Sequence, residues 1–142
     1  MPEAVVVAAT RSPIGRANKG SLVDMRPDDL ATQVITSLME RSGVESTEVE
    51  DLIMGCGQPA GESGYNIGRV VAVEAGMPDV PGVPVNRSSS SSLPTTRLAA
   101  HAIQAAAVAC FISAGVAPVT PFISGMSYPA PGSTNHTSDA PP

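Results

Sequence analysis

Apolar residues recur along the chain with two different spacings, and these predict alternating strands and helices. Short apolar runs typical of buried strands lie at residues 5–9, 51–55, 83–85 and 108–114. Apolar residues three and four positions apart, typical of helices with one buried face, lie at residues 27–42, 65–75 and 91–106. The order is β-α-β-α-β-α-β. We therefore expect an α/β fold, with a mixed, largely parallel sheet and helices on both faces.

Proline and glycine residues indicate where several of these helices and strands begin and end. Pro27, followed by Asp28 and Asp29, is typical of a first helical turn, and Gly43 is typical of a helix end. Pro84 cannot donate a backbone hydrogen bond, so its strand is expected at a sheet edge. Pro94 is tolerated only near a helix start. The third helix is therefore expected to begin near Ser91 or Ser92.

Composition narrows the class of protein. Apolar residues make up 42% and aromatic residues 3% of the 142 residues, so the core must consist mainly of aliphatic side chains. The net charge is −5 and there is no run of Lys or Arg, so we expect no nucleic-acid partner. A helix-turn-helix DNA binder over residues 30–50 is a weaker alternative that this charge disfavours. No apolar stretch approaches the about 20 residues of a membrane span, and no secretory signal is present, so we expect a cytoplasmic protein without membrane contact.

The sequence divides near residue 116. The last 26 residues contain six of the 14 prolines, many Ser, Thr and Gly residues, and no periodicity. We interpret residues 1–116 as the folded domain and residues 117–142 as the loop-rich start of a truncated insertion. Two cysteines, Cys56 and Cys110, are too few for a disulfide framework or a metal site, and we interpret both as buried thiols. No metal or bound cofactor is expected.

The segment with most chemical interest is the serine run at residues 88–92, between a predicted strand and a predicted helix. A side chain in such a turn is exposed at the carboxyl end of the sheet. The N–H groups and positive dipole end of the helix then face any developing negative charge. Serine is also a common helix N-cap, so spacing alone favours a polar turn over a catalytic one.

Several linked blocks of this sequence resemble the thiolase family. They are EAVVVAATRSPIG at 3–15, RPDDL at 26–30, GCGQPAG at 55–61, VNR at 85–87, SSSL at 90–93, TTR at 95–97 and FISAGV at 111–116. The similarity therefore covers residues 3 to 116 in register and identifies the N-terminal half of a thiolase.

The resemblance implies an acyl-CoA acyltransferase. Thiolases cleave a 3-ketoacyl-CoA with free CoA, or condense two acyl-CoA molecules, through a cysteine that accepts the acyl group. It also implies two similar halves stacked in five layers, CoA thioesters as substrates and a homodimer or homotetramer with the third strand near the two-fold contact. The matching position of the nucleophile in this chain is Ser89.

Serine at this position is a large chemical change. A cysteine thiol has a pKa of about 8.5, which a helix N-terminus lowers, whereas a serine hydroxyl needs a base to remove its proton. The family's general-base histidine, its asparagine-histidine pair and its second cysteine belong to the other half. His101 is interpreted as structural, and His136 lies in the tail without a motif. We expect little thiolase turnover from this chain; the alternative is an inactive thiolase-like domain that acts as an oligomerisation or interaction scaffold.

Overall fold

The computed structural model describes residues 3–16 and 18–116. Their regular elements are three helices and three strands with two short 3-10 helices, η1 and η2, between them. In chain order these are α1 (Pro27–Ser42), η1 (Ser46–Glu48), β1 (Asp51–Cys56), η2 (Gly61–Ser63), α2 (Ile67–Glu74), β2 (Gly82–Val85), α3 (Ser92–Gln104) and β3 (Phe111–Val116).

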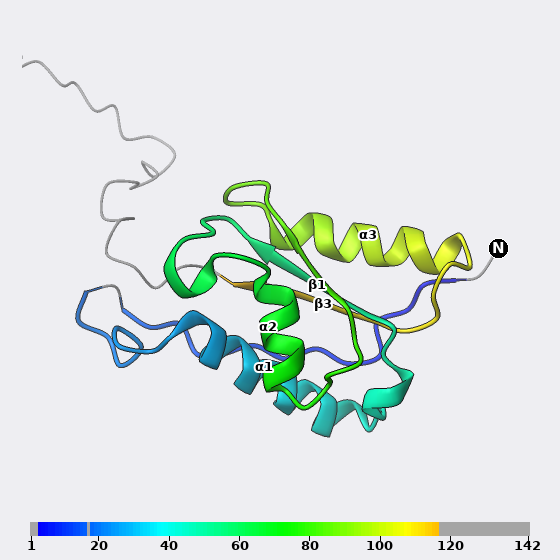
Figure 1. The fold of residues 1–142 in the computed structure, drawn as a ribbon, viewed down its shortest axis with the longest axis horizontal. Helices are drawn as coiled ribbons and strands as arrows, with labels where there is room; N and C mark the ends of the chain where they lie inside the picture. The colour runs from blue at the N-terminus through cyan, green and yellow to red at the C-terminus, as the bar shows by residue number, and fades with distance from the viewer. Residues whose placement is uncertain (1–2, 17, 117–142) are drawn as a thin grey trace, which may run out of the picture.

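The three strands form one parallel sheet in the order β2-β1-β3 (Figure 1). Ile53 at the centre of β1 pairs with Val83 on one side and with Ser113 on the other. The strand that contains Pro84 lies at an edge, as predicted from its missing donor. Because all three strands run in one direction, their carboxyl ends meet at one edge of the sheet. The connection from β2 to α3 begins at this edge.

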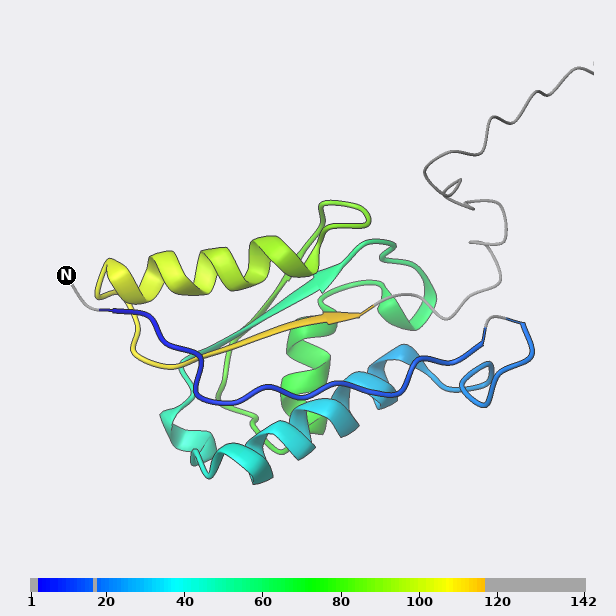
Figure 2. The same ribbon diagram turned by 180° about the vertical axis from the view of Figure 1, so that it is seen from behind.

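Helices cover both faces of the sheet: α1 and α2 lie on one face and α3 on the other (Figures 1 and 2). Leu52 and Met54 of β1 are fully buried and pack in the cluster that includes Ile35 of α1 and Val71 of α2. Ile53, between them, points to the face that α3 covers. The continuous apolar run of β1 is thus explained by burial on both sides.

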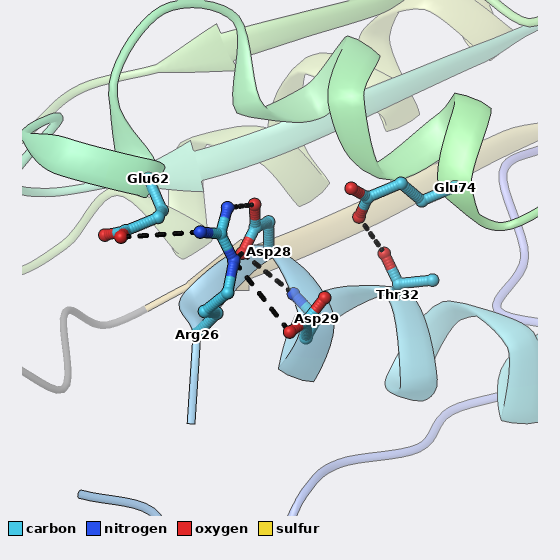
Figure 3. A network of polar contacts seen from close by, with 6 residues as sticks. All are labelled: Arg26, Asp28, Asp29, Thr32, Glu62 and Glu74. Carbon is cyan, nitrogen blue, oxygen red and sulfur yellow. Dashed lines mark hydrogen bonds and ion pairs between the residues drawn. The ribbon is translucent and has the colours of Figure 1, made fainter. Parts of the chain in front are cut away.

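Helix α1 has the predicted boundaries, and a network of polar contacts holds its start. Pro27 opens the helix, and Gly43 closes it with a left-handed φ of 68°. The Arg26 guanidinium donates to both carboxylate oxygens of Asp28, at 3.1 and 2.6 Å, and forms a longer ion pair with Glu62 at 3.5 Å (Figure 3). Glu62 belongs to η2, so the network joins α1 to the loop that follows β1.

The strand predicted at residues 5–9 is wrong. These residues form no strand, and Val5, Val6 and Val7 are 68, 78 and 73% exposed. Figure 2 shows the segment, in dark blue, as extended chain. A strand requires a neighbouring strand for its hydrogen bonds as well as apolar side chains. None of the strands in the described part of the chain pairs with residues 5–9.

The other elements agree in type, with shifted ends. Helix α2 begins at Ile67 rather than at Tyr65, because Tyr65 has a left-handed φ of 53° and the Asn66 side chain caps the helix. Strand β3 begins three residues later than predicted, because α3 ends at Gln104 and Ala106, with φ of 55°, turns the chain. The helix-turn-helix alternative is also wrong, since strand β1 occupies residues 51–56 and only the short η1 separates it from α1.

Candidate active site at the serine turn

Residues 86–91, here called the serine turn, connect the carboxyl end of β2 to α3. Ser89 lies inside this turn, three positions before the first residue of α3, and it is exposed. The helix begins at Ser92, as Pro94 predicts. The predicted location of residue 89, between a strand of the sheet and the amino end of a helix, is therefore confirmed.

The Ser91 hydroxyl links both ends of the serine turn. Ser91 is only 4% exposed. Its hydroxyl O–H donates to the Ser88 carbonyl at 2.6 Å, and its oxygen accepts from the Arg87 N–H at 2.9 Å. Ser88 has a left-handed φ of 50°, which is uncommon for a residue with a side chain. The Asn86 side chain accepts from the Ser88 N–H at 2.9 Å and so also supports this conformation.

Three glycines at the carboxyl edge of the sheet allow the serine turn and the start of α3 to approach closely. A Cβ atom on Gly55 would lie 2.5 Å from the carbonyl carbon of Ser91, and one on Gly57 would lie 2.7 Å from the Ser88 oxygen. A Cβ atom on Gly115 would lie 2.5 Å from the Cβ of Ser92. No other residue type would permit these contacts without a shift of the backbone.

A buried hydroxyl network fixes the first turn of α3 to β3. Thr95 is fully buried, and its hydroxyl oxygen lies 2.6 Å from the Ser92 carbonyl and 2.8 Å from the Ser113 hydroxyl. The Ala114 carbonyl is a further acceptor at 3.3 Å. Because Ser113 and Ala114 belong to β3, this network sets the position of α3 relative to the sheet.

The N–H groups near the start of α3 are only partly available to an anion. Those of Ser90, Ser91 and Leu93 donate to carbonyl oxygens within the serine turn. The dipole of the 13-residue helix still favours negative charge at its amino end. The amino end of α3 therefore lies at the serine turn as expected, but these three N–H groups are already bonded and are not free to face a developing negative charge.

The remaining sequence candidates lie away from reactive positions. Burial raises the pKa of the Cys56 thiol, which is 1% exposed and donates to the Ser63 carbonyl at 3.6 Å. Burial also raises the pKa of Cys110, which is half-buried just before β3. His101 is exposed nine residues after the start of α3, roughly 13 Å along a helix with a rise of about 1.5 Å per residue. His136 lies outside the described residues.

Among the residues that the structure describes, no base contacts the Ser89 hydroxyl, and this hydroxyl makes no hydrogen bond. The same residues contain no group of three or more His, Cys, Asp or Glu side chains that could hold a metal ion. The described part of the chain also has no helix long and apolar enough to cross a membrane.

Sequence reasoning located the serine turn but missed the residues that shape it. Ser91 was considered only as a possible helix start, and the glycines at 55, 57 and 115 were given no role at the site, although they determine the backbone around Ser89. Glycines on alternate positions at the end of a strand were the available signal, because alternate residues lie on the same face. That signal did not show which segment would approach them.

The fold and the turn define a parallel α/β domain that exposes a side chain beside a helix start at the carboxyl edge of its sheet. Residues 4–131 match the family model described as "Thiolase, N-terminal domain", and the chain belongs to the thiolase family. It is 40% identical over 116 residues to a 3-ketoacyl-CoA thiolase of Bacillus subtilis. This alignment covers 81% of this chain and 30% of that protein.

Two further comparisons agree with this family. The chain is 40% identical over 143 aligned positions to a beta-ketoadipyl-CoA thiolase of Acinetobacter baylyi, covering 98% of this chain and 35% of that protein. The crystal structure of the Bacillus anthracis acetyl-CoA acetyltransferase superposes with a TM-score of 0.75 at 34% identity, covering 81% of this chain and 29% of that one. The chain thus spans about a third of the length of these relatives.

Proposed function

We propose that the protein to which this chain belongs is a thiolase-type acyltransferase that acts on CoA thioesters, with Ser89 in the position of the acyl-accepting nucleophile. The match to the thiolase N-terminal domain over residues 4–131 carries this proposal. The exposed position of residue 89, before a helix start and at the carboxyl edge of a parallel sheet, supports it. The names of the relatives, which refer to ketoacyl-CoA and acetyl-CoA, indicate the substrate class.

The chemistry of serine limits the activity of this form. To accept an acyl group, the Ser89 oxygen must form an ester bond while its proton passes to a base, and no described residue is placed to take it. A cysteine at the same position would ionise more readily beside the helix start. We therefore propose low turnover for the chain with Ser89.

The test is thiolysis of acetoacetyl-CoA by free CoA, followed for the whole protein, including the second thiolase half that supplies the family's general base, and for its Ser89→Cys variant. We expect little activity with serine and a rise of at least about 100-fold with cysteine, since nucleophile and base normally act as a unit. Ser92→Ala, which changes an exposed serine three positions away, is the matched control and should give no rise. Equal rates with serine and cysteine would refute the assignment of residue 89.

An inactive scaffold is the second candidate, and serine at 89 is the observation that favours it. Among the described strands β2 pairs with β1 alone; its Val83 is exposed, and so is Tyr65, which precedes the Asn66 side chain that donates to the Gly82 carbonyl of β2. These features support a homodimer or homotetramer for either candidate. Light scattering after size exclusion measures this association. An oligomer without thiolysis by the Ser89→Cys variant favours the scaffold.

The finer assignments are also proposals. We propose a role in fatty-acid and lipid metabolism, which the ketoacyl-CoA in the names of the relatives supports, and a location in the cytoplasm. We further propose a domain boundary near residue 116, where β3 ends, with residues 117–142 opening an insertion. Limited proteolysis that cuts first after residue 116 supports this boundary, and cuts spread through residues 27–116 speak against it.

A further inference from the structure

The serine turn contains one hydroxyl that is buried and fully engaged. Ser91 is 4% exposed, whereas Ser88, Ser89, Ser90 and Ser92 are exposed. Its hydroxyl acts once as donor, to the Ser88 carbonyl at 2.6 Å, and once as acceptor, from the Arg87 N–H at 2.9 Å. These two bonds close a ring that contains the backbone of residues 87 to 91.

Residue 89 lies inside this ring and directly follows the left-handed Ser88. A left-handed residue with a side chain persists only where its surroundings hold it. The Ser88 carbonyl is held from two sides: Ser91 donates to it, and it lies so close to Gly57 that a Cβ atom there would be 2.7 Å away. The backbone at 88 in turn determines the direction in which the side chain at 89 leaves the turn.

We propose that Ser91 is a positioning residue for the nucleophile, which holds Ser88 in its left-handed conformation and thereby directs the side chain of residue 89 toward the start of α3. This inference rests on the proposed function for the role of residue 89. Ser91 itself is not a catalytic residue, because its hydroxyl is buried and both of its hydrogen bonds go to the backbone.

The test uses the full chain with Ser89→Cys, because a thiol reports its environment without any turnover. The rate at which iodoacetamide alkylates the introduced thiol is measured from pH 6 to 10. Peptide mass spectrometry locates the label and separates this thiol from Cys56 and Cys110. With Ser91 present, we expect the introduced thiol to have an apparent pKa below the about 8.5 of a free thiol, because the thiolate faces the helix start.

Adding Ser91→Ala should raise this apparent pKa toward 8.5 and slow alkylation at pH 7 by about tenfold. A tenfold change corresponds to the free energy that one ordinary hydrogen bond contributes. Ser91→Thr keeps the hydroxyl and should preserve at least half of the rate. Ser92→Ala removes a neighbouring exposed hydroxyl and should leave both quantities unchanged. A purely structural role for Ser91 would lower the melting temperature without moving the pKa of the introduced thiol.

Gly57→Ala provides a second variant if Ser91→Ala does not fold. Its Cβ atom would press on the Ser88 carbonyl from the other side, so it should slow alkylation in the same way. An unchanged pKa and rate in Ser91→Ala, or in Gly57→Ala where only that variant folds, overturns the proposal.

The outcome is separable from that of the proposed function. Thiolysis restored by Ser89→Cys without any dependence of alkylation on Ser91 supports the function and overturns the positioning role. Alkylation that depends on Ser91, in a protein that fails to thiolyse acetoacetyl-CoA, supports the positioning role and counts against the function.

Discussion

Thr95→Val tests whether the buried hydroxyl network secures α3 to the sheet. Valine has almost the same shape as threonine, so the substitution removes the hydroxyl without opening a cavity. The lost contacts are those to the Ser92 carbonyl at 2.6 Å, to the Ser113 hydroxyl at 2.8 Å and to the Ala114 carbonyl at 3.3 Å. Thr95 is fully buried, so water cannot replace them.

The expected loss follows from the partners that remain. Ser113 keeps a contact of 3.0 Å with the Thr96 hydroxyl, so it is not left unsatisfied. A hydroxyl has one proton, so Thr95 donates to only one carbonyl at a time and the net loss is one or two hydrogen bonds. At about 0.5–1.5 kcal/mol each, this gives about 1–3 kcal/mol of unfolding free energy. For a domain of this size, about 1 kcal/mol lowers the melting temperature by about 4 °C.

The measurement is thermal unfolding followed by circular dichroism, with Thr96→Val as the matched control. Thr96 is exposed, and within the described residues its hydroxyl bonds to Ser113 alone, so the loss of stability in Thr96→Val should stay within about 0.5 kcal/mol. Equal melting temperatures for Thr95→Val and Thr96→Val would refute the claim that the buried network, rather than apolar contact alone, fixes α3.

Three other perturbations test separate parts of the structure. The hydrogen bond and charge of Arg26 lower the pKa of Asp28 below its ordinary 3.8. The ionised Asp28 therefore stabilises the folded protein above that pH, and this stabilisation is lost as the pH falls through the lower pKa of the folded state. Acid unfolding curves should show a smaller loss of stability below about pH 4 for Asp28→Asn than for wild type. Gly55→Ala should lower the unfolding free energy by about 1–3 kcal/mol in a urea titration, because the new Cβ would lie 2.5 Å from the Ser91 carbonyl carbon. An unchanged urea midpoint of unfolding would contradict this close approach. A thiol reagent at pH 7 should label Cys110 faster than Cys56, because both have a raised pKa but Cys56 is fully buried; faster labelling of Cys56 would contradict the burial.

Elements with local boundary signals were predictable from the sequence. Helix α1 begins at Pro27 and ends before Gly43 because both residues act on their own backbone. Strand β1 was predicted to within one residue, since an apolar run requires only burial on both faces. The run at residues 5–9 is also apolar, yet it forms no strand, because pairing depends on a neighbouring strand that the local sequence does not reveal.

The candidate site shows the same division. The turn between β2 and α3 was predictable, because a strand, a polar run and a helix follow one another in the sequence. The roles of individual serines in the run 88–92 were not, since five identical side chains have identical local preferences. The buried Ser91 differs from the exposed Ser89 by the two hydrogen bonds of its hydroxyl and by the close approach of its backbone to Gly55, more than 30 residues earlier in the chain.

The position and the reactivity of residue 89 have different physical origins. Its position depends on the bonds of Ser91, the left-handed Ser88 and the close glycines, and none of these involves the atom at the end of its own side chain. Its reactivity depends on that atom, because a thiol ionises near neutral pH and a hydroxyl does not. Replacing oxygen by sulfur at 89 should therefore change the intrinsic reactivity of the side chain and preserve its placement, whereas a change at Ser91 should alter the placement and, through it, the pKa of a thiol at 89. Under the proposed function, the serine turn holds residue 89 in the place of the acyl acceptor, and its serine makes that site slow.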